Sequence, residues 1–312
     1  MTHGTNGAPP TGLAQALAAG PVVLDGGLSN QLESAGHDLG DDLWSARLLA
    51  ERPEAITQAH LAYLEAGADV VITASYQATF EGLARRGFGR DRAAALIASS
   101  VALAREAVAR ARAKGVARPL WVAASAGPYG ALLADGSEYR GRYGLTVDEL
   151  ERFHRPRLEV LAAARPDVLA LETVPDADEA TALLRAVRGL GMPAWLSYTV
   201  DGSRTRAGQP LEEAFAPAAG AKEVIAVGVN CCAPEDVEAA VETAARVTGK
   251  PVVAYPNSGE VWDARSRSWT GHRTLTPAQA ERWRAAGARL IGGCCRVGPA
   301  TIAQLARTLR TG

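Results

Sequence analysis

Residues 224–257 read VIAVGVNCCAPEDVEAAVETAARVTGKPVVAYPN, and this stretch decides the fold. It begins with a short apolar run rich in β-branched residues, continues through a segment with helical spacing at 234–248, and ends in a second apolar run. A proline in the first helical turn and a glycine at 249, just past the end, are typical boundary signals of a helix. The stretch therefore predicts a strand, a helix and a second strand, the unit of parallel sheets.

The same unit recurs along the whole chain. Eight apolar runs predict strands, at residues 22–27, 69–76, 120–127, 168–173, 194–200, 224–231, 252–257 and 290–295. Helical patterns between them predict helices at 56–66, 92–114, 147–164, 176–190, 234–248 and 277–286, the last with Thr276 as its N-cap. The alternation predicts an α/β fold, a single (β/α)8 TIM barrel. The alternative, an open doubly wound sheet, predicts a glycine-rich GxGxxG turn that is absent here.

Composition narrows the class of protein. The 312 residues include 33 Lys and Arg against 34 Asp and Glu, a formal net charge of −1, which favours neither nucleic acid nor a membrane surface as a partner. No apolar run approaches the ~18 residues of a membrane span, and the first residues lack the basic start of a signal peptide. We expect a cytoplasmic protein with a disordered tail at 1–12 and one barrel at 13–312. The sequence does not predict an oligomeric state.

In a barrel the chemistry lies at the carboxyl ends of the strands. The polar and thiol residues that end the eight runs are Asp25, Gly26, Gly27, Ser75, Ser125, Glu172, Ser197, Thr199, Asn230, Cys231, Cys232, Asn257, Cys294 and Cys295. We expect this set to contain the functional site, because these ends meet at one rim of the barrel.

The cysteines of this set form two adjacent pairs, on the sixth and eighth strands. Neighbouring residues of a strand point to opposite faces, so both members of a pair reach one centre only where the strand has ended. Gly292 and Gly293 supply that freedom before Cys294 and Cys295, whereas only one member of the other pair needs to point inward. Three thiolates fit a zinc ion with an open fourth position. A closed site with all four cysteines, a disulfide, and buried cysteines acting as small apolar side chains remain alternatives.

A site rich in thiolates suits a thiol substrate, because a coordinated thiol is deprotonated. Asp25 and Glu172 are then suited to an ammonium group, although each has an alternative role at the start of a helix. Backbone N–H groups of Gly26 and Gly27 could bind a carboxylate at a helix N-terminus. Thiol, ammonium and carboxylate together describe a thiol amino acid.

Seven motifs extend this pattern along the chain: DGGLSNQLE, ADVVITASYQAT, ASAGPYGALLADGSEYRG, LETVPDADEA, GVNC, YPNSGEVWD and IGGCC. With these motifs the sequence resembles the homocysteine S-methyltransferase family. The similarity covers about residues 20–307 and is greatest to the short single-domain enzymes that use S-methylmethionine or S-adenosylmethionine. The long C-terminal extension of betaine-using relatives is not seen, so we expect a sulfonium donor.

The resemblance implies a zinc-dependent barrel that methylates homocysteine to methionine. It implies that Cys231, Cys294 and Cys295 bind Zn²⁺, while Cys232 stands at a variable position. It also implies that Asp25 and Glu172 bind the amino group of homocysteine, with Gly26 and Gly27 in the adjoining loop. Three further strand-end residues are predicted to bind substrate: Ser75, Asn230 and Asn257.

The predicted reaction is attack of a zinc-held homocysteine thiolate on the methyl group of the sulfonium. Four aromatic residues are candidates for cation–π contact with the donor, namely Tyr76, Tyr129, Trp262 and Trp269. Two alternatives remain open. The acceptor could be another thiol or selenol, such as selenohomocysteine or selenocysteine, or the protein could be a non-catalytic zinc or thiol redox sensor.

Overall fold

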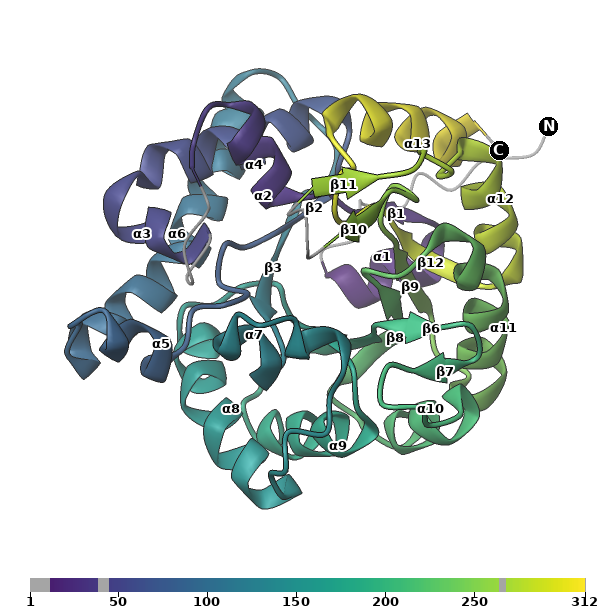
Figure 1. Ribbon diagram of the computed structural model, residues 1–312. Coiled ribbons are helices and arrows are strands. Elements are labelled where there is room, and N and C mark those ends of the chain that lie inside the picture. Colours follow the sequence, from purple (N-terminus) through teal and green to yellow (C-terminus); the bar gives the residue numbers. More distant parts are fainter. Residues whose placement is uncertain (1–11, 39–44, 264–267, 312) are drawn as a thin grey trace.

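Eight parallel strands form one sheet, and helices surround it (Figure 1). The computed structural model describes residues 12–38, 45–263 and 268–311. The strands are β1 Val22–Val23, β2 Val70–Ile72, β3 Trp121–Ala126, β4 Val168–Val174, β5 Ala194–Tyr198, β8 Val224–Asn230, β9 Val252–Tyr255 and β12 Ala288–Ile291. The strand order is β1-β12-β9-β8-β5-β4-β3-β2, and a parallel bridge between Leu24 and Val70 brings the two ends of the sheet together. The predicted (β/α)8 barrel is confirmed.

The strands end earlier than most of the predicted runs. The run predicted at 290–295 contributes only its first two residues to β12, and the two glycines at 292 and 293 follow. A side chain at Gly292 would meet Leu24 and the Asp25 carbonyl, so the chain passes here at close range to the loop after β1. Cys294 and Cys295 therefore lie on the loop after β12 rather than in the strand.

The helices are α1 Leu13–Ala19, α2 Leu28–Ser34, α3 Ser45–Glu51, α4 Pro53–Ala66, α5 Phe80–Arg85, α6 Arg90–Ala113, α7 Tyr129–Leu133, α8 Val147–Ala163, α9 Ala177–Ala186, α10 Leu211–Ala219, α11 Val237–Thr248, α12 Pro277–Ala286 and α13 Pro299–Thr311. The six predicted helices are present as α4, α6, α8, α9, α11 and α12, with differences at some ends, and the other helices were not predicted. Thr276 caps α12 through a capping box. The helix predicted at 176–190 ends at Ala186 because Gly189 and Gly191 take left-handed conformations. The one predicted at 234–248 begins as a 3-10 turn, η2 Pro234–Asp236.

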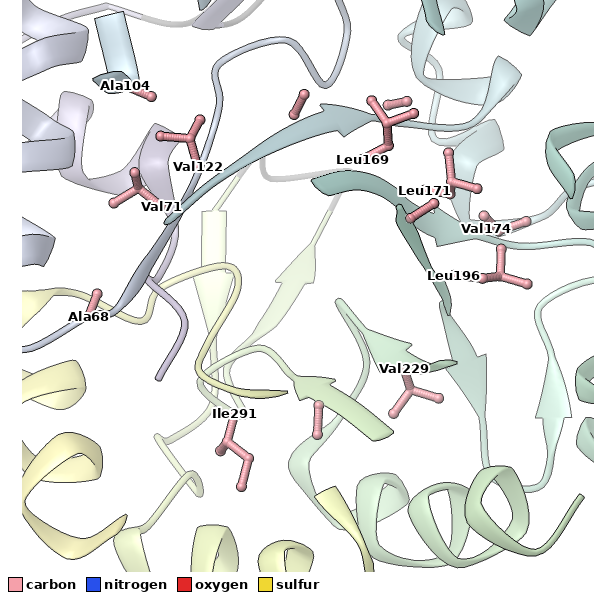
Figure 2. Close-up of a cluster of buried hydrophobic side chains, with 14 of the residues drawn as sticks. Ala68, Val71, Ala104, Val122, Leu169, Leu171, Val174, Leu196, Val229 and Ile291 are labelled. Carbon is pink, nitrogen blue, oxygen red and sulfur yellow. The ribbon is translucent and has the colours of Figure 1, made fainter. Parts of the chain in front are cut away.

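Alternate residues of the strands build two separate cores. Side chains such as Trp121, Trp195 and Leu290 fill the inside of the barrel, and Leu13 and Leu17 of α1 belong to the same cluster. Helix α1, which the sequence analysis did not predict, therefore covers the amino end of the barrel. The other faces of the strands pack on the surrounding helices; Figure 2 shows this set with Val71, Val122, Leu169, Leu171, Leu196, Val229 and Ile291.

Two short antiparallel hairpins were not predicted and lie at the carboxyl end of the barrel. β6 Val200–Asp201 pairs with β7 Arg204–Thr205 after β5, and β10 Val261–Asp263 pairs with β11 Ser268–Thr270 after β9. The loop after β3 holds α7 and a 3-10 turn, η1 Ser137–Tyr139. These additions surround the rim where the predicted site residues lie.

The expected tail at 1–12 lies, except for Gly12, outside the described residues. Among the residues that the structure describes, no helix combines the length and apolar character needed to cross a membrane.

Candidate active site

The structure brings three cysteine thiols together at the carboxyl ends of β8 and β12. The Sγ atoms of Cys231, Cys294 and Cys295 all lie within 4.8 Å of one another. Cys231 directly follows β8 and takes a φ of 49°, a left-handed conformation that turns the chain out of the strand. Cys231 is buried, and the other two cysteines are partly exposed. The spacing and the donor type suit one metal ion.

Cys232 has a different environment. It is fully buried and packs in the outer core between the strands and the helices. Desolvation raises the pKa of its thiol far above the ordinary value. Cys232 is thus placed as an apolar side chain, away from the three-thiol cluster.

Cys231 and Cys294 are paired as a disulfide in this structure, with their Cα atoms 5.6 Å apart. This pairing is one of the alternatives that the sequence left open. Metal binding by the same two sulfurs would require their reduced thiolate forms and is therefore incompatible with this disulfide.

Asn257 holds the two cysteine-bearing loops together. Its backbone N–H donates to the Cys232 carbonyl at 2.9 Å, and its side-chain Oδ1 accepts from the Cys295 N–H at 3.2 Å. In addition, the Cys294 N–H donates to the Pro256 carbonyl at 2.7 Å. Asn257 was predicted to bind substrate, and this stays a prediction; the observed contacts connect it to the loop that carries Cys294 and Cys295.

Gly26 and Gly27 press against the other side of the thiol loop. A Cβ atom at Gly26 would lie 2.1 Å from the Val297 carbonyl oxygen, and one at Gly27 would lie 2.6 Å from the Cys294 carbonyl oxygen. The Gly27 N–H donates to the Val297 carbonyl at 3.0 Å. This N–H is therefore not offered to a substrate carboxylate, which corrects our expectation for Gly27; glycine is needed here for close approach.

Asp25 is a buried carboxylate with one free oxygen. Its Oδ2 accepts from the Ile72 N–H at 2.8 Å, whereas its Oδ1 is buried and has no hydrogen-bond partner among the described residues. Burial raises the pKa of Asp25 well above its ordinary value; the bond from Ile72 opposes this rise, and the charge of Glu172 adds to it. A cation at Oδ1 would relieve both the desolvation and the repulsion.

Glu172 is the second buried carboxylate of the rim. The Ser125 hydroxyl donates to its Oε1, and the Tyr255 hydroxyl donates to its Oε2 at 2.9 Å. Burial raises the pKa of Glu172 to about 7, although both hydrogen bonds oppose the rise. Ser75 is linked to Glu172 through Ser125, because the Ser75 hydroxyl donates to the Ser125 carbonyl at 2.8 Å. Ser75, a predicted substrate-binding residue, therefore supports the strand that carries Ser125.

Asn230 holds the backbone beside Glu172. Thr173 has a φ of 58°, which is rare for a β-branched residue. Asn230 Oδ1 accepts from the Thr173 N–H at 2.7 Å, and its Nδ2 donates to the Thr173 hydroxyl at 2.7 Å. The Ser197 hydroxyl donates to the same Oδ1 at 2.7 Å. The predicted substrate binding by Asn230 stays a prediction; the observed bonds hold the backbone of the segment that follows Glu172.

The aromatic candidates have separate environments. Tyr76 lies beside Thr173, and the charges of Glu138 and Glu172 add to the rise in its pKa that burial causes. The Tyr129 ring packs against Tyr143 and Phe153 instead. The side chains of two further candidates lie outside the described residues, namely Trp262 and Trp269.

Two residues of the rim were missed by the sequence analysis, Glu138 and Tyr139 of η1. The Tyr139 hydroxyl lies within interacting distance of the Cys295 thiol, and the charge of Glu138 acts on both. Glu138 is 4% exposed. Two signals pointed to the DGSEYRG segment: it lies in a long loop after a strand, and it belongs to one of the motifs that carry the family resemblance.

The fold and the site together define a class of protein: (β/α)8 barrels with a cluster of three cysteines that could hold a metal ion, and buried carboxylates, at the carboxyl ends of their strands. The chain belongs to the homocysteine S-methyltransferase family, whose model matches residues 22–309. It is therefore a methyltransferase.

Individual relatives cover nearly the whole chain. Homocysteine S-methyltransferase 4 of Zea mays is 47% identical over 309 residues, 94% of this chain and 90% of that protein. The metallated form of the Escherichia coli homocysteine methyltransferase MmuM is similar with a TM-score of 0.84 and 44% identity, over 92% of this chain and 96% of that one. The oxidised form of MmuM has the same TM-score and identity, over 92% and 95%.

Proposed function

We propose that the protein is a zinc-dependent homocysteine S-methyltransferase that takes its methyl group from a sulfonium donor, S-methylmethionine or S-adenosylmethionine, and forms methionine. One observation carries the proposal: three thiols lie within 4.8 Å of one another at the same rim as Asp25, whose Oδ1 has no partner among the described residues. The thiols suit a thiophilic metal, and the carboxylate suits an ammonium group. Homocysteine carries both a thiol and an ammonium.

The residues present fit zinc. Cys231, Cys294 and Cys295, when reduced, would hold the ion, since thiolates are preferred zinc ligands and three of them leave one position for substrate. Zinc in such a site supplies a substrate thiol that stays deprotonated at neutral pH. The proposed site needs reduced cysteines. Because thiols stay reduced in the cytoplasm, we propose that the protein is cytoplasmic.

Asp25 and Glu172 orient the acceptor. An ammonium group between them would take the free Oδ1 of Asp25 and balance the repulsion between the two carboxylates. Charge-assisted hydrogen bonds of this kind fix both position and direction. Asp25 and Glu172 would bind the ammonium group of a selenol amino acid equally well. Methyl transfer to a selenol amino acid is therefore measured beside methyl transfer to homocysteine.

The transfer itself needs alignment more than acid–base catalysis. A bond forms between the acceptor sulfur and the methyl carbon while the bond from that carbon to the donor sulfur breaks. The electron pair goes to the donor sulfur, which leaves as a neutral thioether and needs no proton. The barrel, residues 13–312 in our proposal, with 1–12 as a tail, therefore contributes by holding two substrates in line.

The test is zinc content and methionine formation with S-methylmethionine, S-adenosylmethionine and betaine, for the wild type and for Cys231→Ala. We expect zinc and methyl transfer in the wild type with a sulfonium donor, and loss of both in the variant. Cys232→Ala is the matched control, because the neighbouring cysteine lies outside the cluster, and it should keep both. Methyl transfer that persists in Cys231→Ala would refute the proposal.

The disulfide between Cys231 and Cys294 favours a second candidate, a redox sensor without catalysis. A sensor offers no role for a free carboxylate oxygen at Asp25. It predicts a protein that contains no zinc under reducing conditions and forms no methionine with any donor.

A further inference from the structure

Glu138 is a buried acid that the proposed mechanism does not yet use. It lies in η1, in the loop after β3, and its Oε2 is buried without a hydrogen-bond partner among the described residues. Burial raises its pKa, its own backbone N–H opposes this, and the charge that acts on it is that of Asp135, another acid. A buried carboxylate in this position is costly unless a cation meets it.

Glu138 is the neighbour in the chain of a residue that meets the three-cysteine cluster. The hydroxyl of Tyr139, which follows Glu138 in η1, lies within interacting distance of the Cys295 thiol. The charges of Glu138 and Glu172 both act on Tyr76, whose ring belongs to the same rim.

The loop is built to hold Glu138 in place. A Cβ atom at Gly130 would lie 2.4 Å from the Glu138 backbone nitrogen, so α7 packs tightly on η1. The buried side chain of Gln77 donates to the Ala131 carbonyl at 3.0 Å and ties α7 to the loop after β2. Arg140 donates to the Ser137 hydroxyl at 2.7 Å within the turn. These contacts hold the backbone of the turn that carries Glu138.

We propose that Glu138 faces the sulfonium centre of the methyl donor and selects for its positive charge. This inference rests on the proposed function. A sulfonium has no N–H or O–H to donate, so a protein recognises it by charge and by aromatic faces. For methyl transfer the sulfonium centre must lie close to the acceptor sulfur, which the proposed mechanism places beside Cys295. Glu138 supplies the charge at that place, and Tyr76 and Tyr139 supply aromatic rings.

The same placement favours product release. The donor loses its positive charge when the methyl group leaves, so the attraction to Glu138 ends with the reaction. Because the charge is already reduced in the transition state, Glu138 contributes more to binding of the donor than to the chemical step.

The experiment compares wild type, Glu138→Gln and Asp135→Asn. Gln keeps the shape and removes the charge, and Asp135→Asn is the matched control, since this exposed acid lies in the same loop. Calorimetry gives the dissociation constants of S-methylmethionine and of methionine, its analogue with a neutral sulfur, and kinetics gives KM and kcat. Thermal unfolding checks that each variant is folded, and Glu138→Asp serves as a second variant that keeps the charge.

We expect Glu138→Gln to raise KM for S-methylmethionine about tenfold or more, with kcat and homocysteine affinity changed by less than about threefold. Its preference for S-methylmethionine over methionine should fall towards one, and Asp135→Asn and Glu138→Asp should keep most of it. An unchanged donor KM overturns the inference while the proposed function stands. Equal weakening of both ligands also overturns it, because the carboxylate would then bind the ammonium that they share. Selective binding without methyl transfer in the wild type would overturn the proposed function alone.

Discussion

Two groups of buried carboxylates lie close to the loop after β3, and they differ in what surrounds them. At the rim, Asp25 leaves one oxygen without a partner and faces the charge of Glu172. Further out lies the Glu179 cluster, which we define as Glu179 of α9 with His154 and Arg157 of α8. Its Glu179 Oε1 lies 2.9 Å from His154 Nε2, and the charge of Arg157 lowers the pKa of Glu179 against the effect of burial.

A raised pKa does not by itself distinguish the role of Glu172 from that of Glu179. Burial raises the pKa of both Glu172 and Glu179 to about 7. The difference lies in the neighbouring charges. The charge of Arg157 lowers the pKa of Glu179, and Arg157 also donates to the Gly127 carbonyl, so this cluster supports the loop after β3. The neighbouring charge that acts on Asp25 is that of another acid, Glu172, and it adds to the rise in pKa that burial causes.

Removal of the cation from the Glu179 cluster should have the largest effect. Arg157→Leu leaves a buried carboxylate without its charge partner and removes the donor to Gly127, so we expect a loss of about 3–5 kcal/mol in unfolding free energy. Urea unfolding measures it. A loss below about 1 kcal/mol would show that the Glu179 cluster does not support the structure, and the cluster would then not differ in this respect from the carboxylates of the rim.

The opposite result is expected at the rim. Asp25→Asn removes a buried charge that no cation of the described residues offsets, so the unfolding free energy should stay the same or rise. Homocysteine binding should weaken by about 2–4 kcal/mol, because the ammonium loses its charged partner. Isothermal titration calorimetry and urea unfolding on one preparation separate the two effects. A stability loss as large as that of Arg157→Leu would contradict the assignment.

Asn230 provides an intermediate case, because it supports the rim without carrying a charge. Asn230→Ala leaves the Thr173 N–H without its acceptor, at a cost of about 1–3 kcal/mol in stability. Homocysteine KM should rise by a smaller factor than in Asp25→Asn, since Glu172 remains but is less well directed. Ser197→Ala, which removes one hydrogen bond to Asn230 Oδ1, is the control and should have the weaker effect on KM.

The smallest expected effect is a dependence on pH. The folded protein without substrate keeps the proton of Glu172 up to about pH 7, whereas the unfolded chain loses it near the ordinary pKa of 4.5. The folded state thus binds more protons in this window, and stability should fall as pH rises, by at most ~1.4 kcal/mol per pH unit for this group. Glu172→Gln should reduce the slope in urea unfolding, and an unchanged slope would contradict the raised pKa.

Homocysteine binding should show the same proton directly. An ammonium between Asp25 and Glu172 requires ionised carboxylates, so binding near neutral pH should release protons. Calorimetry in two buffers of different ionisation enthalpy measures this release, which should be smaller in Glu172→Gln.

The sequence by itself determined the barrel and the place of the thiols. Parallel strands buried on both faces give continuous apolar runs, which are local signals, and the topology of a barrel then brings all the strand ends to one rim. The hairpins β6–β7 and β10–β11 were not predicted because strands of two or three residues leave little local pattern. Helix α1 was not predicted because its apolar face is short.

Only the tertiary structure decided what each polar residue at the rim does. Asn230 meets Thr173 across 57 positions of sequence, and Asn257 meets Cys295 across 38. Hydrogen bonds over such separations have no sequence pattern, so these residues could not be told apart from substrate ligands. The same holds for Glu138 and Glu179: both are acids in the sequence, and only the fold places Glu179 in the field of Arg157, whereas among the described residues the charge that acts on Glu138 is that of Asp135.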